Sequence, residues 1–460
     1  MRRKVGIVAG ACASLVLAGT ANAATWTPTP DEGRPSAARH EAPQIVHPSA
    51  SAERAVPAAA VPRASSTPPP TGAGGDPTDH AAAPGRLNRS MSEQSTVTGP
   101  QKVGELLTVD RIVGYAAAPR TETFRYPRAS YVKLHFNRLF MLPGDYLTVS
   151  NAQGTESYRY DAPSVLSNGT IDKWAMSITG DTAVLKLHRT ARDTLGLSPV
   201  LRRLGVNIDR VARGYSRAEQ QRAPDSPPTS AGASGREESV CGNDESADAV
   251  CYRTADPVAY TRSKAIARLL INGTQLCTGW RLGANNRMLT NNHCFATSPG
   301  ASGTEVWFNY QCARCGSHDV SPPVKVWGER VLATDRTYDY TLFTVRNFAQ
   351  VQNFGHLTFD TRRPVKGQGL YVPQHPAGMP TRIAGALGDR AGTCTVADPA
   401  YDGYAQDSDI AYYCDTEGGS SGSPVLSRAT NRVVALHHFG GCPNSGVRAD
   451  ILAAKLRGLV

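Results

Sequence analysis

Residues 414–425 read CDTEGGSSGSPV, and three glycines and three serines fill positions 418 to 423. Glycine adopts backbone conformations that other residues avoid, so such a run is either a flexible linker or a tight loop that presents a hydroxyl group. Cys414 precedes the run, and the β-prone pair Val425 and Leu426 follows it. These flanks favour an ordered loop ahead of a strand. Which chemistry such a loop serves depends on the other motifs of the chain.

The last part of the chain, residues 241–460, has the pattern of an all-β domain. Short apolar and β-branched runs are separated by Gly, Asn and Asp turn signals, which is typical of a β-barrel or a β-sandwich. Two further motifs fall within it, LTNNHC at 289–294 and TYDYTLF at 337–343. Each places a polar side chain, His293 or Asp339, next to the end of an apolar strand.

A histidine, an aspartate and a serine together suit acyl transfer. A serine hydroxyl is a weak nucleophile at neutral pH unless an imidazole accepts its proton, and a buried carboxylate then stabilises the imidazolium. We therefore expect Ser421 as the nucleophile, His293 as the base and Asp339 as the carboxylate. Asp335 lies close in sequence and is the alternative to Asp339. The backbone amides of Gly419 and Ser421 are expected to form the oxyanion hole, which stabilises the negative oxygen of the tetrahedral intermediate.

The motifs follow the order His, Asp, Ser around a G-x-S-G-x-P core, and in this order they resemble the chymotrypsin-fold (trypsin-like) serine endopeptidases secreted by bacteria. CTGWRL, LTNNHC, WFNYQCARC, DYTLF and VVALHHFGGC are similar to the lysyl endopeptidases, whereas DTEGGSSGSPV is also similar to the V8-type glutamyl endopeptidases. The resemblance covers roughly the last 210 residues. It implies a double β-barrel peptidase domain that hydrolyses peptide bonds through an acyl-enzyme on Ser421.

The resemblance also implies where the substrate residue before the cleaved bond (P1) binds. The base of this S1 pocket lies six residues before the nucleophile, at Asp415, so basic P1 residues, Arg or Lys, are expected. Two alternatives stay open: Asp415 caps a loop, or a histidine binds an acidic P1 side chain. The lysyl endopeptidases carry their selective aspartate where this chain has CPNSGV at 442–447. The expected S1 residues are Asp415, Thr416, His437, His438, Gly440 and Gly441.

Activation is expected to differ from that of trypsin-like zymogens, in which an aspartate directly before the nucleophile pairs with the newly formed N-terminus. Ser420 occupies that position here. Burying an ammonium group beside a hydroxyl alone is costly. We therefore expect removal of the pro-part to unblock the cleft or to follow folding, rather than to build the oxyanion hole through an ion pair.

Nine of the ten cysteines lie between Cys241 and Cys442, and the tenth is Cys12. In an exported protein this distribution indicates disulfide bonds in the C-terminal domain. The resemblance implies three disulfides: Cys277–Cys294, Cys241–Cys442 and Cys251–Cys315. A fourth, Cys394–Cys414, follows from the cysteines that remain, and Cys312 is then left unpaired. A metal site at Cys312 and Cys315 is the alternative. We expect no metal and no cofactor.

Five segments are expected along the chain. Residues 1–23 have a basic start, an apolar run and Ala-Asn-Ala, which is typical of a secretory signal peptide. Residues 24–100 are rich in Ala, Pro and Ser and are expected to be a disordered pro-segment. Residues 101–213 alternate apolar and polar side chains as a small antiparallel β-sandwich does, and they are expected to form a pro- or accessory domain. Residues 214–240 are a predicted linker, and residues 241–460 are the peptidase-like domain.

The remaining expectations concern location and partners. No later run reaches the roughly 20 apolar residues of a membrane span, so we expect a secreted protein without a membrane anchor. The formal net charge of +10 comes from scattered basic residues, which does not favour nucleic-acid binding. Protein or peptide substrates and a monomeric state are expected. The competing class is a non-catalytic binding protein that uses the peptidase fold as a scaffold.

Overall fold

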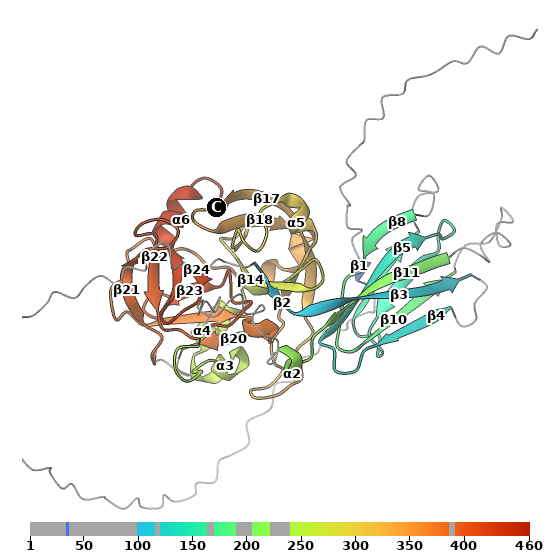
Figure 1. Cartoon of the computed structure of the whole chain (residues 1–460), viewed down its shortest axis with the longest axis horizontal. Coiled ribbons are helices and arrows are strands. Elements are labelled where there is room, and N and C mark those ends of the chain that lie inside the picture. The colour runs from blue at the N-terminus through green and yellow to red at the C-terminus, as the bar shows by residue number, and fades with distance from the viewer. Residues whose placement is uncertain are drawn as a thin grey trace, which may run out of the picture.

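The computed structural model of the chain describes residues 34–35, 99–115, 120–162, 170–189, 205–220, 240–385 and 392–460. These residues form a β-sandwich beside a larger part that contains two β-sheet structures (Figure 1). All strand pairs within the four sheets are antiparallel; for consecutive strands such as β13 and β14, a short turn is enough to join them.

The β-sandwich module consists of two five-stranded sheets. Strands β6 and β10 alternate buried and more exposed side chains along their length, which is the pattern of a sheet with one face on a core. The first sheet has the order β1 (Arg34–Pro35), β7 (Ser157–Asp161), β6 (Tyr146–Ser150), β10 (Thr182–His188), β4 (Thr121–Arg125). The second has the order β3 (Gly104–Gly114), β11 (Gly205–Gly214), β5 (Tyr131–Leu139), β8 (Thr170–Trp174), with β9 (Ile178–Thr179) also paired to β5.

The first barrel is closed, because β13 pairs with β14 as well as with β16. Every side chain of β13 is buried, since one face lines the barrel and the other is covered from outside. The barrel has the order β13 (Ile266–Ile271), β16 (Thr304–Phe308), β17 (Val324–Asp335), β18 (Tyr340–Val345), β15 (Met288–Thr290), β14 (Gln275–Arg281). One strand from the N-terminal side of the module, β2 (Gln101–Lys102), adds to the edge of β14.

The second β structure is an eight-stranded sheet that forms a half-barrel. It carries the glycine and serine loop of residues 418–423 directly ahead of β23. Its order is β12 (Ala247–Asp248), β20 (Arg382–Ala384), β19 (Leu370–Gln374), β23 (Pro424–Ser427), β24 (Val433–Phe439), β25 (Asn444–Arg448), β22 (Asp409–Tyr412), β21 (Val396–Tyr401). An apolar cluster that includes Trp280, Leu342 and Leu436 joins this sheet to the first barrel.

The helices among the described residues are short, and all of them lie between strands except α6, which follows the last strand. The α-helices are α2 (Arg217–Gln220), α3 (Tyr252–Ala255), α4 (Pro257–Ser263), α5 (Ser298–Ser302) and α6 (Ala449–Lys455). The 3₁₀ helices are η1 (Ala249–Cys251), η2 (Phe348–Gln350), η3 (Gln352–Phe354) and η4 (Pro376–Gly378). Among the helices of the described residues, none is both long enough and apolar enough to cross a lipid bilayer.

The fold class expected from the sequence, a chymotrypsin-like double β-barrel preceded by a small antiparallel β-sandwich, is confirmed. The expected signal peptide at 1–23 lies outside the described residues, and so does the pro-segment at 24–100 except for residues 34–35 and 99–100. Within the expected linker at 214–240, the described structure continues through α2, and residues 221–239 lie outside it.

Candidate active site

The loop after β15 carries His293 and is fixed at both ends. Cys294 forms a disulfide with Cys277 on β14. The Asn291 side chain donates a hydrogen bond to the backbone carbonyl of Asp339 at 2.8 Å. The loop is therefore attached to β14 and to the residue directly ahead of β18.

Asp339, directly ahead of β18, binds His293 through both carboxylate oxygens. The Oδ1 atom accepts the backbone amide of His293 at 2.9 Å, and Oδ2 lies 2.7 Å from Nδ1 of the ring. Asp339 has a φ of 40°, a left-handed conformation that is rare outside glycine and that is often found at functional sites. Asp335 instead pairs with Lys455 at 2.8 Å on the surface. Of the two aspartates considered, Asp339 is the one that contacts the histidine.

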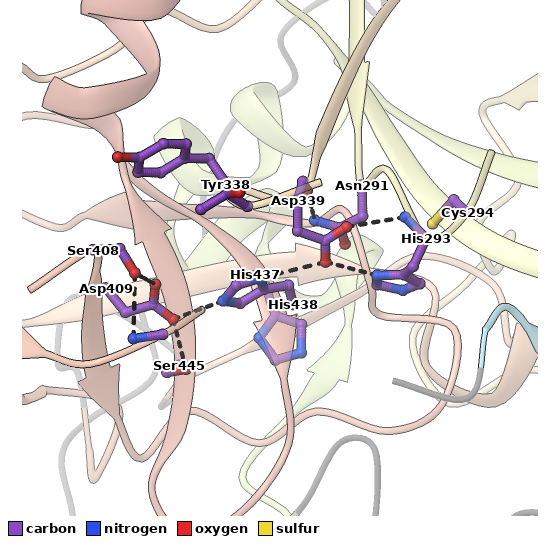
Figure 2. A network of polar contacts seen from close by, with 12 residues as sticks. Asn291, His293, Cys294, Tyr338, Asp339, Ser408, Asp409, His437, His438 and Ser445 are labelled. Atoms are coloured by element: carbon purple, nitrogen blue, oxygen red, sulfur yellow. Dashed lines mark hydrogen bonds and ion pairs between the residues drawn. The ribbon is translucent and has the colours of Figure 1, made fainter. Parts of the chain in front are cut away.

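A second histidine approaches Asp339 from β24 (Figure 2). His438 Nδ1 lies 3.3 Å from Asp339 Oδ2, and His438 Nε2 lies 2.6 Å from Asp409 Oδ2. Asp409 in turn accepts hydrogen bonds from Ser408 Oγ at 2.7 Å and Ser445 Oγ at 2.9 Å. All of these side chains are buried. The dashed contacts of Figure 2 thus run from His293 through Asp339 and His438 to Asp409.

The opposite charges in this network stabilise the ionised forms of His438 and Asp339. Burial alone disfavours an imidazolium, but Asp409 and Asp339 outweigh it and raise the pKa of His438 from 6.5 to about 9. Burial alone would likewise raise the pKa of Asp339, but His293 and His438 lower it well below its ordinary value. At neutral pH the network therefore contains a charged His438 between two carboxylates.

Ser421 lies beside β14, the strand that is bridged to the histidine loop. Its backbone carbonyl accepts the amide of Thr278 at 2.8 Å. Gly422 has a φ of 87°, and a Cβ there would lie 2.2 Å from the Thr278 carbonyl, so only glycine permits this approach. The His293 Nε2 atom has no hydrogen-bond partner within the described ranges, so the Ser421 hydroxyl does not hydrogen-bond to it in this structure.

Gly419, two residues before Ser421, has a fixed peptide orientation. Its φ is 99°, and a Cβ there would lie 2.4 Å from Leu276 Cδ2. The Thr278 hydroxyl donates to the Gly419 carbonyl at 2.9 Å. The loop also contains a turn in which the Ser420 amide donates to the Glu417 carbonyl at 2.9 Å. These contacts organise the backbone around the two amides that we expect to form the oxyanion hole.

Asp415 lies in the buried approach to this loop and binds backbone amides. Its Oδ1 accepts the amide of Cys241 at 3.0 Å, and its Oδ2 accepts the amide of Glu245 at 2.8 Å. The carboxylate therefore caps the segment that begins the C-terminal domain, as in the loop-capping alternative. Burial raises its pKa above the ordinary value, and the amide hydrogen bonds oppose this effect.

The other expected S1 residues lie around the same loop. Thr416 Oγ1 donates to Asn444 Oδ1 at 3.1 Å. His437 is fully buried, with Nδ1 2.6 Å from Tyr412 Oη, and burial lowers its pKa to about 3, so the ring is neutral. Gly440 and Gly441 directly follow β24, and the Gly441 carbonyl lies 3.3 Å from Cys241 Sγ. His438, by contrast, contacts Asp339 and Asp409.

The disulfides of the structure are the four pairs given above: Cys241–Cys442, Cys251–Cys315, Cys277–Cys294 and Cys394–Cys414. Cys312 is a buried free thiol, whose pKa is raised to about 11 by burial and by Asp248. The side chains of Cys277, Cys294 and His293 come close enough to suggest a metal site. Both sulfurs are oxidised in the disulfide, however, so this set does not offer thiolate ligands.

One contact at this site was not expected from the sequence. The Gln101 side chain of β2 lies over Gly418, where an added Cβ would come 2.1 Å from Gln101 Oε1. Strand β2 pairs with β14 through Gln101 opposite Leu276 and Lys102 opposite Gln275. A segment from outside the C-terminal domain therefore lies against the loop that carries Ser421.

Residues 277–436 match the family model of the trypsin-like peptidase domain. This span contains His293, Asp339 and Ser421, and it covers strands of both β structures. Together with the fold, the match supports a serine peptidase. The chain is also similar to a protein of known sequence, the secreted RxLR effector protein 73 of Plasmopara viticola. The two are 39% identical over 236 residues, and the alignment covers 49% of this chain and 58% of that protein. The chain thus spans little more than half the length of this relative.

Several solved structures are similar to this chain. One is the inactive form of the Rv3671c protease, with 18% identity and a TM-score of 0.32; the alignment covers 44% of this chain and 91% of that chain. A related structure of that protein, a Ser343Ala mutant from M. tuberculosis H37Rv, has 16% identity and a TM-score of 0.33 over 44% of this chain and 90% of that chain. A Glu endopeptidase in complex with MPD has 18% identity and a TM-score of 0.35 over 47% of this chain and 100% of that chain. None of these findings assigns the chain to the lysyl or the glutamyl branch.

Proposed function

We propose that the protein is a secreted serine endopeptidase that cleaves peptide bonds through an acyl-enzyme on Ser421. The observation that carries this proposal is the double contact between Asp339 and His293 next to a loop that presents Ser421. A carboxylate on Nδ1 keeps the proton there, so Nε2 has the lone pair that a general base needs. Secretion is supported by the signal-like residues 1–23 and by the word "secreted" in the name of the relative.

In the proposed acylation, Ser421 Oγ attacks the carbonyl carbon of the scissile bond and transfers its proton to His293 Nε2. The negative oxygen of the tetrahedral intermediate accepts hydrogen bonds from the amides of Gly419 and Ser421. His293 then gives the proton to the leaving nitrogen, and the C–N bond breaks. A water molecule, deprotonated by the same histidine, hydrolyses the ester and restores the Ser421 hydroxyl. The Ser421–His293 hydrogen bond is expected to form when substrate binds, since such bonds are often long in the free enzyme.

We propose that basic P1 residues are preferred over acidic ones. Asp415 and Glu245 place carboxylates in this region, since the Glu245 amide donates to Asp415, while the nearby Asp244 pairs with Arg382 at 3.3 Å. A cationic side chain would gain from this field, and an acidic one would be repelled. Because both Asp415 oxygens already bind amides, the preference is expected to come from charge more than from a direct ion pair. Glutamyl specificity is the second candidate; in it, His437 would bind an acidic P1 side chain through a hydrogen bond from its neutral ring, since burial keeps the ring uncharged.

The experiment that tests the proposed function is cleavage of a denatured protein mixture, followed by mass spectrometry of the new peptide ends. The proposal predicts cuts that disappear in Ser421→Ala and that follow Arg or Lys. Cuts after Glu would favour the second candidate. No cuts by the folded protein, whether the chain is intact or cut within 221–239, would instead favour the non-catalytic binding protein.

A further inference from the structure

The β-sandwich and the first barrel meet along a surface that is as buried as the core of either part. Tyr131 and Val103 of the module belong to one apolar cluster with side chains of the barrel. In the opposite direction, Trp327 of β17 packs into the apolar core of the sandwich. The barrel side chains that share the cluster with the module are Leu270, Leu276, Trp307 and Tyr310.

Glu305 of β16 is completely buried at this surface, and groups of the module bind its carboxylate. Lys133 of β5 forms an ion pair with it, and only 1% of the Lys133 side chain is exposed. The amide of Ser177 donates to Glu305 Oε1 at 3.0 Å, and the Ser177 hydroxyl donates to Oε2. Burial would raise the pKa of Glu305, but Lys133 and Lys325 lower it below its ordinary value. The charge is thus compensated by both parts of the protein.

Lys325 of β17 is a second buried charge of the barrel, and it too is bound by groups of the module. Its Nζ donates to the Ser177 carbonyl at 2.7 Å and lies 2.7 Å from Glu156 Oε1 of the module. The Lys325 side chain is fully buried. Two buried charges of the barrel, Glu305 and Lys325, therefore have partners of opposite charge that the module supplies.

Hydrogen bonds from both ends of the module, and from Tyr131 within it, also reach the C-terminal domain. The Val103 amide donates to the Thr274 carbonyl at 2.8 Å, and the Tyr131 hydroxyl donates to the Gly273 carbonyl at 2.8 Å. At the other end, Arg217 of α2 lies 2.9 Å from His318.

We propose that residues 101–220 stay bound to residues 240–460 as a non-covalent subunit when the chain is cut within 221–239. Separation would expose Trp307, Trp327 and Leu270 to water together, and large exposed apolar patches are rare on monomeric proteins. It would also break the almost completely buried ion pair between Lys133 and Glu305, and the pair between the buried Lys325 and Glu156, whose side chain is 14% exposed. Separable domains usually meet through more polar and hydrated contacts, whereas this surface resembles an obligate subunit interface. This inference is independent of the proposed catalytic function.

The test uses the full chain with Ser421→Ala, to prevent self-digestion, and with the recognition sequence of a specific protease inserted in 221–239. After complete cutting, the sample is diluted to about 100 nM and analysed by gel filtration and native mass spectrometry. The proposal predicts one species that contains both fragments. Two separate, folded fragments at this concentration would overturn it.

A pair of variants tests the part played by the buried charges. Lys133→Met keeps the side-chain stem but removes the charge that faces Glu305, so the dissociation constant of the cut fragments should rise at least about tenfold. Arg111→Met is the matched control, because Arg111 pairs with Glu122 at 3.6 Å within the module and its side chain is 62% exposed. Equal dissociation constants for the two variants would contradict this role. If Lys133→Met does not fold, Lys325→Met makes the same test from the barrel side.

Discussion

The Nδ1 atom of His293 lies 2.7 Å from Oδ2 of Asp339, although 46 positions separate the two residues in the chain. The backbone amide of His293 binds the other oxygen of the same carboxylate at 2.9 Å. Two contacts to one side chain set both the position of the histidine loop and the tautomer of its ring. This geometry is the one that a general base acting on a serine hydroxyl requires.

Removing the charge of Asp339 should therefore impair the chemical step. Asp339→Asn is expected to lower kcat by about 10⁴-fold, because an amide at this position favours the wrong tautomer of His293. Asp335→Asn is the control, since Asp335 contacts Lys455 on the surface and should leave kcat almost unchanged. Steady-state kinetics on a chromogenic peptide would measure both. A larger loss in Asp335→Asn than in Asp339→Asn would contradict the assignment.

His438 should make the stability of the protein depend on pH. Its pKa is about 9 in the folded state and 6.5 for the ordinary side chain, so the folded state retains a proton that the unfolded chain releases. The stabilisation is complete below about pH 6.5 and is lost as the pH rises through about 9. The free energy of unfolding should fall by on the order of 3 kcal/mol across this range.

Urea unfolding of the Ser421→Ala protein at several pH values would measure this effect without self-digestion. His438→Gln in the same background is the control, and its free energy of unfolding should fall much less over the range. Parallel curves for the two proteins would show that His438 is not the titrating group.

The sequence allowed much of this site to be predicted. The motifs LTNNHC and TYDYTLF pointed to His293 and Asp339, which the structure brings into contact, because each motif combines a reactive side chain with a strand signal. Ser421 as the nucleophile stays a prediction from GGSSGSPV. The contact of His438 with Asp409 could not be predicted in this way. It depends on the pairing of β22 and β24 with β25, and neither residue stands in a motif that indicates the other.

Burial and contacts between residues distant in the chain account for the other features that the sequence did not predict. Asp415 was expected as an S1 group, but its oxygens bind the amides of Cys241 and Glu245, which lie 174 and 170 positions away in the chain. The buried ion pairs between the sandwich and the barrel could not be predicted from the sequence either, since a lysine or a glutamate in a strand usually lies on an exposed face. Such contacts depend on tertiary structure that local patterns do not encode.

Asp415 should still influence the choice of substrate through its charge. Asp415→Asn is expected to lower kcat/KM for Arg and Lys at P1 by about 10-fold or more and to change that for neutral P1 residues much less. A matched series of peptides that differ only at P1 would measure the ratio. An equal loss for all P1 residues would mean that Asp415 acts only as the cap of the segment at Cys241.

Gln101 should limit access to the active loop in the uncut chain. Its side chain lies against Gly418, so Gln101→Gly is expected to speed the reaction of Ser421 with a small fluorophosphonate several-fold. Lys102→Ala, in the same short strand, is the control and should have little effect, because the Lys102 side chain is exposed. Equal rates in the uncut wild-type and Gln101→Gly proteins would show that β2 does not cover the loop.

The most direct test of the central claim is covalent labelling by a fluorophosphonate, which reacts with serines activated by a neighbouring base. The account predicts that the wild-type protein and Ser423→Ala are labelled, that Ser421→Ala is not labelled, and that all three have the same circular dichroism spectrum. Labelling of folded Ser421→Ala, or no labelling of the folded wild-type protein either before or after it is cut within 221–239, would contradict Ser421 as the nucleophile.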